Sequence, residues 1–323
     1  MKGESRPVSD AAIDDVVLPF AVEALDLRGR LVRLGPGIDS IVQRHGYPAP
    51  VARLLCEAAA LTVLLGSAMK QDGLFQLQAR TEGAVDMIVV DFDTPDRLRA
   101  FARFDAARLA AAEAEGKTGG AELLGRGHLG LTVDPGGSGN RYQGVVALEG
   151  EGLERAAHHY FERSEQIPTV VRLAVGEIVT AAGAHWRAGG LIVQFLPESE
   201  DRRRQADLAP GDAPAGTLPP EPDEDEAWTE GRALAGTVEA HELIDPSLSG
   251  ERLLFRLFHE RGVRVFPPAD VRDQCRCSTA SIRTMLQRFT AQERADMVGE
   301  DGKIGVTCEF CSEKREFDPK EFD

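Results

Sequence analysis

The chain has 323 residues, of which 42% are hydrophobic, and its formal net charge is −16. This length predicts about two domains of ordinary size, and the apolar content excludes a chain that is disordered throughout. Because phosphate binding depends on clustered Lys and Arg, the excess of acidic residues disfavours a nucleic-acid partner.

The N-terminal segment has no apolar stretch that follows a basic one, so the sequence shows no signal peptide. The most apolar run, residues 58–69, is too short to cross a bilayer, which takes roughly 20 apolar residues. We therefore expect a cytoplasmic protein with no membrane partner. Four of the five cysteines gather in one short tail, which indicates metal or redox chemistry rather than a secreted disulfide scaffold.

Strand and helix patterns mix along the first part of the chain. Residues 25–34 carry leucines on both sides of an Arg-Gly-Arg sequence and predict two short strands around a turn. The apolar run 48–70 predicts a largely buried helix with prolines near its start. Alternating polarity in 75–79 predicts a half-buried strand, and the continuous apolar run 84–92 predicts a strand buried on both faces.

A hairpin is predicted next, with strands in 129–133 and 142–148 on either side of a glycine-rich turn. Residues 152–163 predict a helix, and the segments VRLAVGEIVT and LIVQFLP predict two more strands. Because strands and helices do not alternate regularly, we expect an α+β fold, with a mixed α/β core domain over 1–197, rather than a doubly wound sheet.

Composition changes sharply at Glu198. Residues 198–230 contain five prolines and eleven acidic residues but few large apolar ones, which is typical of a flexible acidic linker. Apolar residues then recur at mostly helical spacing, so 231–260 predicts one or two amphipathic helices packed against the main domain. We expect a region of linker and amphipathic helices over 198–265 and a small C-terminal domain over 266–323.

The C-terminal domain contains two closely spaced cysteine pairs, Cys275 with Cys277 and Cys308 with Cys311, separated by 30 residues. Zinc prefers four tetrahedral ligands, and cysteine sulfur is a favoured donor. Two close pairs allow two turns of backbone to offer two thiolates each. The sequence therefore predicts that these four residues hold one Zn²⁺ ion in an all-cysteine site.

The segment between the pairs supports this prediction. An apolar stripe at helical spacing runs from Ile282 to Phe289, and Thr290 with Glu293 has the spacing of a capping box that opens a second helix. An Asp-Gly turn signal then precedes an alternating strand that ends at Cys308. A segment that folds in this way can bring the four sulfurs together.

The spacing leaves three interpretations open. The cysteines can be unliganded thiols that never meet, or zinc can be purely structural and hold a tail too small to bury its own core. The third interpretation is a redox switch, because zinc-bound cysteines are thiolates, the form that oxidants attack. If each pair closes to a disulfide, all four ligands are lost and the metal is released. Release of the metal removes on the order of 10 kcal/mol of folding free energy. Oxidation would then unfold the tail.

Several segments of the chain carry a family resemblance. In the tail they are VRVFPPADVRDQCRCSTASI and EDGKIGVTCEFC, and elsewhere they are YQGVV, YFERSEQIP, GGLIVQFLP and RLFHE. Together they resemble the heat-shock protein 33 family of bacterial redox-regulated holdases. This combination of motifs is specific, and the resemblance covers most of the chain.

The resemblance implies a chaperone that responds to oxidative and heat stress, and not an enzyme, so we expect no catalytic residues. In that family the reduced zinc form is inactive. Peroxide with heat, or hypochlorous acid, forms two disulfides, expels zinc and unfolds the tail and linker. By similarity the disulfides here would be Cys275–Cys277 and Cys308–Cys311. The activated protein would be a homodimer that holds unfolding client proteins without hydrolysing ATP.

The linker departs from the family, since residues 199–227 look longer and more acidic than usual. A holdase needs apolar surface that stays hidden until it is required. The amphipathic region 231–260 lies between the predicted metal switch and the core. We therefore expect its release to uncover a client-binding face.

Two rival functions use the same cysteines. The C-x-x-C sequence of Cys308 and Cys311 suits a thiol–disulfide oxidoreductase, but the βαβ context expected around such a motif is missing. A constitutive zinc module, for instance one that binds nucleic acid, is the other rival. Residues 271–323 contain nine basic and eleven acidic residues, so no basic footprint supports nucleic-acid binding.

Three further signals predict no functional site. A Gly-x-Gly-x-x-Gly sequence at 125–130 is followed by a strand pattern rather than a helix, so we expect no nucleotide site there. Cys56 lies in the apolar helix and is expected to be a buried core thiol. His158 and His159 are neighbours on a predicted helix and are expected on the solvated surface.

Overall fold

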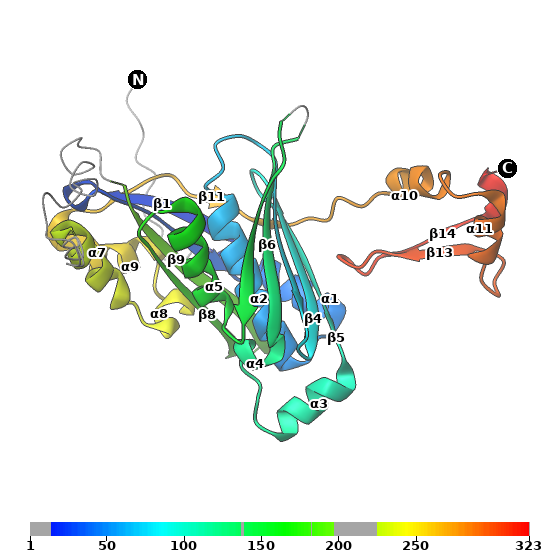
Figure 1. The fold of residues 1–323 in the computed structure, drawn as a ribbon, viewed down its shortest axis with the longest axis horizontal. Coiled ribbons are helices and arrows are strands. Elements are labelled where there is room, and N and C mark those ends of the chain that lie inside the picture. Colours follow the sequence, from blue (N-terminus) through cyan, green and yellow to red (C-terminus); the bar gives the residue numbers. More distant parts are fainter. Residues whose placement is uncertain (1–13, 137–138, 182, 197–224, 323) are drawn as a thin grey trace, which may run out of the picture.

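The computed structural model describes residues 14–136, 139–181, 183–196 and 225–322. Within these residues two sheets enclose helix α2 (Ala49–Gly66), which contacts strands of both (Figure 1). Most residues of α2 are buried, so this helix forms the centre of the main core. By length and composition α2 could cross a membrane, but 78% of that stretch is buried inside the protein, as is typical of a core helix.

The first sheet has the strand order β10, β1, β2, β9 and β8, with β11 also paired to β1, and all its pairings are antiparallel. Its strands are β1 (Val16–Val22), β2 (Leu27–Leu34), β8 (Thr169–Thr180), β9 (Gly183–Phe195), β10 (Arg264–Val265) and β11 (Ala269–Asp270).

The prediction of two short strands within residues 25–34 is wrong, because β2 is a single continuous strand. Gly29 lies in the middle of β2, opposite Phe20 of β1. A Cβ atom at Gly29 would lie 2.2 Å from Cζ of Phe20. The glycine is therefore needed for the close approach of an aromatic ring and not for a turn.

The second sheet has the strand order β12, β5, β4, β3, β6 and β7 and is antiparallel except for the parallel pair of β12 and β5. The predicted hairpin is confirmed as β6 and β7. The strands are β3 (Leu74–Thr81), β4 (Val85–Asp93), β5 (Arg97–Phe104), β6 (Arg126–Asp134), β7 (Tyr142–Glu149) and β12 (Arg272–Asp273).

Short helices complete the core. They are α1 (Pro36–His45), α3 (Ala106–Ala114), α4 (Gly120–Leu124) and α5 (Leu153–Tyr160), which continues into a π-helical turn at Phe161–Glu165. Two mostly antiparallel sheets with helices between and around them confirm the predicted α+β class.

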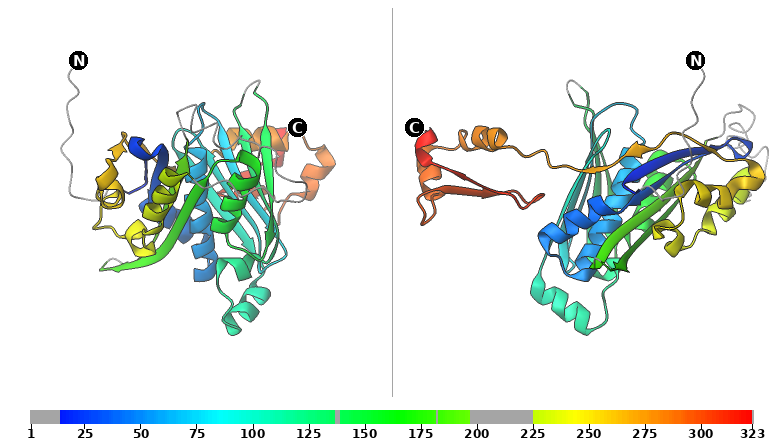
Figure 2. Two further views of the ribbon diagram at one scale, coloured as in Figure 1. Left: turned by 60° about the vertical axis from the view of Figure 1, so that its left-hand side comes forward. Right: turned by 180° about the vertical axis from the view of Figure 1, so that it is seen from behind.

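Three helices cover the face of the first sheet that points away from α2, as Figures 1 and 2 show. They are α7 (Glu226–Gly236), α8 (Ala240–Ile244) and α9 (Gly250–Phe258), and we call them the helical cover. The predicted packing against the main domain is confirmed, but there are three helices rather than one or two. A new helix begins twice after α7, because Glu239 forms a capping box at the start of α8 and the Ser249 side chain caps α9.

The helical cover shares a hydrophobic cluster with the sheet beneath it. The sheet contributes alternate residues of its strands, because successive side chains of a strand point to opposite faces. The buried members include Leu18, Phe20, Leu31, Leu191 and Val193 from the sheet and Trp228, Leu243, Leu253, Leu257 and Phe258 from the cover. This apolar sheet face is hidden only while the cover stays in place.

Two buried arginines of the sheet also hold the turn between α8 and α9. The Arg33 guanidinium donates hydrogen bonds to the carbonyl oxygens of Asp245 and Leu248, and its side chain is almost fully buried. Arg187 Nε donates to the carbonyl oxygen of Ile244 at 2.7 Å. Because hydrogen bonds to charged groups are stronger than neutral ones, these contacts pin the cover at its middle.

The tail forms a separate small module joined to the body by an extended segment (Figures 1 and 2). It contains α10 (Thr279–Leu286), α11 (Ala291–Asp296), the hairpin of β13 (Ile304–Thr307) and β14 (Lys314–Phe317), and a final 3₁₀ turn at Pro319–Phe322. The predicted capping box of Thr290 and Glu293 is confirmed. The buried core of this module is small and consists of Ile282, Leu286, Ile304 and Phe317.

The predicted flexible acidic stretch lies largely outside the described residues, since 197–224 are not described. The three-domain division at 197/198 and 265/266 stays a prediction. Residues 264–273 pair with strands of both core sheets through β10, β11 and β12, so the chain is bonded to the core between the cover and the tail module.

Candidate metal centre

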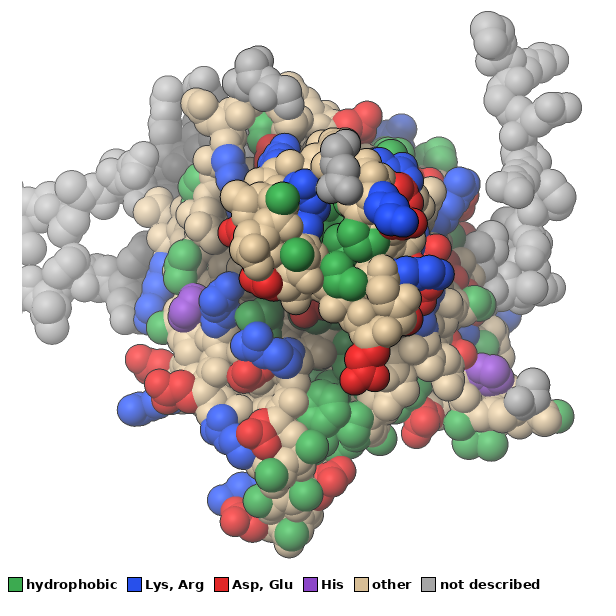
Figure 3. Space-filling model, turned by 90° about the vertical axis from the view of Figure 1, so that its right-hand side faces the viewer, with side chains coloured by type: hydrophobic (Ala, Val, Ile, Leu, Met, Phe, Trp, Pro, Cys, Tyr) green, Lys and Arg blue, Asp and Glu red, His purple; other side chains and the backbone are tan. Residues whose placement is uncertain are grey.

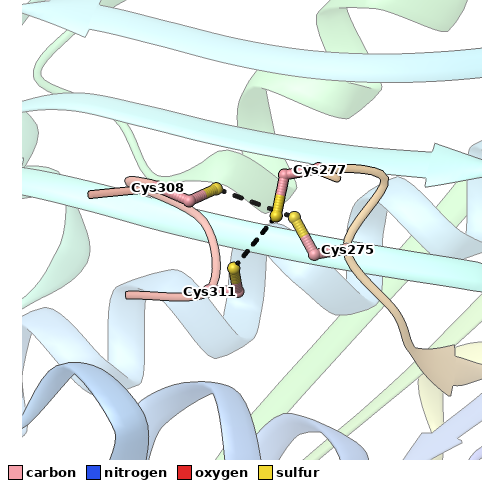
Figure 4. Close-up of side chains that lie close together, drawn as sticks. All are labelled: Cys275, Cys277, Cys308 and Cys311. Carbon is pink, nitrogen blue, oxygen red and sulfur yellow. Dashed lines mark hydrogen bonds between the residues drawn. The ribbon is translucent and has the colours of Figure 1, made fainter. Parts of the chain in front are cut away.

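The four cysteines of the two predicted pairs come together at one place (Figure 4). Cys275 and Cys277 lie in the extended segment between β12 and α10, and Cys308 and Cys311 lie in the turn of the hairpin formed by β13 and β14. The convergence of side chains from two segments 30 residues apart is what the sequence predicts.

Local hydrogen bonds shape both cysteine segments. The Ser278 side chain accepts a hydrogen bond from the Ser281 N–H and caps α10, so the helix begins at Thr279 and Cys277 lies just before it. In the hairpin turn, the Cys308 N–H donates to the Glu313 carbonyl at 3.1 Å and the Ser312 N–H donates to the Cys308 carbonyl at 2.8 Å. These bonds close the turn around Cys308 and Cys311, so both side chains project from it on a fixed backbone.

The sulfur positions fit a tetrahedral metal site. All four sulfurs lie within 4.8 Å of one another, with 3.7 Å between those of Cys275 and Cys308 and 3.3 Å between those of Cys277 and Cys311. Four sulfurs bound about 2.3 Å from a zinc ion at tetrahedral corners are about 3.8 Å apart. The four side chains can therefore hold one metal ion as thiolates.

Both of these sulfur contacts join one cysteine pair to the other. The distances therefore do not select the disulfides Cys275–Cys277 and Cys308–Cys311, and this pairing stays a prediction.

Two arginines lie beside the sulfurs. Arg99 Nη1, from core strand β5, is 3.9 Å from the Cys275 sulfur, and Arg315 Nη1, from β14, is 3.3 Å from the Cys277 sulfur. Four thiolates around a divalent ion carry a net negative charge, and both guanidinium groups offset it. Hydrogen bonds from such outer groups orient the ligands of a metal site.

The surroundings separate the acidities of two of the thiols. Burial raises the pKa of Cys275, but hydrogen bonds from the Cys277 backbone, the Cys277 thiol and Arg99 outweigh burial and lower this pKa to about 7. Burial and the neighbouring sulfurs of Cys311 and Cys275 raise the pKa of Cys277 to about 12. Cys275 is therefore the readier thiolate of the two.

The other sequence signals are placed as follows. Cys56 is fully buried in α2, so the expectation of a buried core thiol is confirmed. Burial raises the pKa of this thiol and thereby lowers its reactivity. The Gly-x-Gly-x-x-Gly sequence lies at the start of strand β6. The expectation that His158 and His159 lie on the solvated surface is wrong, because both are half-buried. His158 Nε2 also accepts a hydrogen bond from the Val171 N–H at 2.9 Å.

The sequence does not predict which core residues lie next to the two cysteine segments. His45, Asp91 and Arg99 all contact the cysteine segments or the sulfurs themselves. They come from α1, β4 and β5 and lie 176 to 264 residues before the tail residues that they contact. The sequence predicts no strand over Arg97–Phe104, so nothing in it places Arg99 beside Asp91 or either residue near the tail.

Comparison with known proteins decides the family. A family model described as "Hsp33 protein" matches residues 15–318. The chain belongs to the Hsp33 family. Its relatives in this family include the "33 kDa chaperonin" of Caulobacter vibrioides, which is 45% identical over 95% of this chain and 96% of that protein. The "33 kDa chaperonin" of Pseudomonas fluorescens is 35% identical over 96% of this chain and 93% of that protein.

A crystal structure of a 33 kDa chaperonin from Thermotoga maritima, a heat shock protein 33 homolog, matches the fold with a TM-score of 0.73. It covers 95% of this chain and 96% of its own at 18% identity, and at this identity the match shows the fold alone. The predicted resemblance to the Hsp33 family is confirmed. This is a chaperone family, which is not an enzyme class. The four-cysteine cluster of this chain fits a redox-regulated centre.

Proposed function

We propose that this protein is a redox-regulated, ATP-independent holdase of the cytoplasm. In its reduced form Cys275, Cys277, Cys308 and Cys311 hold one Zn²⁺ ion and the protein is silent. After oxidation it binds unfolding client proteins as a homodimer. The observation that carries the proposal is the convergence of four cysteine sulfurs within 4.8 Å of one another in a chain of the Hsp33 family.

The chemistry of the switch follows from the ligand atoms. Zinc, when bound, keeps all four sulfurs as thiolates and supplies much of the folding free energy of the tail. Each disulfide forms when two thiolates lose two electrons to a peroxide, which takes up two protons and leaves as two water molecules. Closing Cys275–Cys277 and Cys308–Cys311 uses all four ligand sulfurs, so the ion is no longer held.

The small apolar core of the tail makes metal loss an unfolding event. Only Ile282, Leu286, Ile304 and Phe317 are buried in its cluster, whereas structural zinc contributes on the order of 10 kcal/mol to a small domain. Residues 264–273 connect this module to the helical cover and are held to the core by the pairings of β10, β11 and β12, so unfolding reaches α9 only after these pairings open. Release of the cover exposes the apolar face of the first sheet, which we propose as the client-binding surface.

The oxidoreductase alternative is not favoured. Cys308 and Cys311 lie in the turn of a two-stranded hairpin rather than at the start of a helix that follows a strand. That is not the βαβ setting in which a C-x-x-C motif acts as a thioredoxin-like catalyst.

A light-scattering assay tests the holdase. A client enzyme is unfolded by heat in the presence of this protein, which is either reduced and zinc-loaded or pretreated with peroxide at elevated temperature. We expect only the oxidised sample to suppress aggregation, because only its apolar sheet face is uncovered.

The control is the oxidised sample after reduction with dithiothreitol and return of zinc, which is expected to lose the suppression. Equal suppression by reduced and oxidised samples would show a constitutive holdase with structural zinc. Suppression by neither would exclude the chaperone function.

A further inference from the structure

The residues inside each cysteine motif lie against the second core sheet. Arg276 stands between Cys275 and Cys277, and its Nη2 is 3.0 Å from Oδ2 of Asp91 on β4. Phe310 stands between Cys308 and Cys311 and meets the ring of Phe101 on β5 edge-on, with centroids 4.9 Å apart. Both halves of the metal centre therefore contact the same part of the core.

Arg99 connects these contacts. Its guanidinium lies over the ring of Phe310, 3.9 Å from the ring centroid, and its Nη1 lies 3.9 Å from the Cys275 sulfur. Its Nε also donates to Asp91 at 2.9 Å. One side chain of the core thus contacts a ligand sulfur of one motif and the intervening aromatic ring of the other.

Asp91 fixes the position of Arg99. The side chain of Asp91 is only 1% exposed, and a charge so deeply buried is stable only when it is paired and hydrogen-bonded. Gln76 Nε2 donates to it at 2.8 Å, and Arg99 and Arg276 supply the positive charge. The carboxylate therefore holds one arginine from the core and one from the tail in fixed geometry.

Additional contacts flank this group. His45 Nε2 lies 2.8 Å from the Glu309 carbonyl oxygen, inside the second motif. Asp273, two residues before the first cysteine, forms an ion pair with Arg44 and accepts a hydrogen bond from Ser40 Oγ at 3.0 Å. The docking surface thus includes the end of α1 as well as β4 and β5.

We propose that this surface of the core is a docking platform for the metal centre and that Arg99 is its positioning residue, which slows release of the metal and oxidation of the cysteines. The inference rests on the proposed four-cysteine zinc site but concerns the core. It makes the reactivity of the cysteines dependent on a folded second sheet. A core that loosens at β4 and β5 would free the cysteine turns and make them more reactive.

The test measures zinc transfer from the full-length reduced protein to a chromogenic chelator, with no client present. Arg99→Met is expected to speed transfer about tenfold, the lower end of the effect of removing an outer partner of a metal ligand. Arg99→Lys keeps the charge and should give an intermediate rate. The matched control is Arg97→Met on the same strand, because Arg97 pairs with Asp93 at 2.9 Å, and it should leave the rate unchanged.

A double-mutant cycle separates docking from damage to either partner. Phe310→Ala alters only the tail and leaves the core intact, and it should also speed zinc transfer. Combined with Arg99→Met, its effect should be smaller than in the wild-type background, because both substitutions remove the contact between Arg99 and Phe310. The thermal unfolding of each variant checks that the core is folded.

The outcomes distinguish this inference from the proposed function. A wild-type protein that binds no zinc would contradict the metal centre itself. Two results would overturn the docking platform and leave the switch in place, provided that the wild type binds zinc. One is a zinc-transfer rate of Arg99→Met within twofold of the wild-type rate. The other is full additivity of the Arg99→Met and Phe310→Ala effects in the cycle.

Discussion

A Cys311→Ser variant is expected to lose nearly all of its zinc and to unfold from about residue 274 to the C-terminus. A serine hydroxyl does not replace a thiolate as a zinc ligand at neutral pH. Without zinc the tail depends on a small apolar cluster of four buried and four half-buried side chains. Structural zinc contributes on the order of 10 kcal/mol in modules of this kind. We expect the two-sheet core to keep its fold, because its hydrophobic cluster does not include the tail helices or hairpin.

Metal analysis and hydrogen exchange measure both parts of this prediction. The zinc content should fall from one per chain to less than about a tenth, and amide protection should disappear in α10, α11 and the hairpin of β13 and β14. The control is Cys56→Ala, which removes the cysteine outside the centre and should keep full zinc content. A Cys311→Ser protein with a protected tail and one zinc per chain would contradict the assigned ligand set.

A Phe258→Ala variant is expected to hold clients while it is still reduced. Phe258 is the last residue of α9 in the helical cover. It is fully buried against the first sheet and stacks on Phe20 of β1, with ring centroids 5.6 Å apart. Truncating a buried phenylalanine costs about 3–5 kcal/mol. If this cost falls on the packing of the cover, the equilibrium constant for release of α7, α8 and α9 rises more than a hundredfold.

The same helix supplies the matched control. Phe255 lies one turn earlier on α9 and is 61% exposed, so Phe255→Ala removes an aromatic ring without opening the buried cluster. Light scattering with an unfolding client and binding of a hydrophobic dye should both rise for reduced Phe258→Ala and not for Phe255→Ala. Zinc content must stay at one per chain in both. Silence of reduced Phe258→Ala, with the cover shown to be released by hydrogen exchange, would exclude this sheet face as the client surface.

The local elements of this protein could be predicted from its sequence because their signals are local. The four cysteines, the capping box of Thr290 and Glu293, and the apolar run of α2 lie within short windows of residues. These patterns predict, in turn, one cluster of sulfurs, one helix start and one buried helix. The structure agrees with all three.

Contacts between distant segments could not be predicted in the same way. The sequence around Gly29 predicts a turn, because only the fold shows that the Phe20 ring fills the space where a side chain of residue 29 would lie. The sequence pattern predicts no strand around Arg99, and nothing in the spacing of Asp91 and Arg99 indicates that Cys275 and Arg276 lie against them. A periodic pattern records which face of an element is buried but not which partner covers it.

The most direct test of the switch follows zinc release and client holding in one peroxide time course at elevated temperature. Aliquots are taken for zinc transfer to a chelator, for disulfide mapping by mass spectrometry and for light scattering with an unfolding client. We predict that one zinc per chain is released as the disulfides Cys275–Cys277 and Cys308–Cys311 form. We also predict that holding activity rises at the same rate as zinc is released. Full activity in samples that still retain zinc and four reduced cysteines would contradict this account.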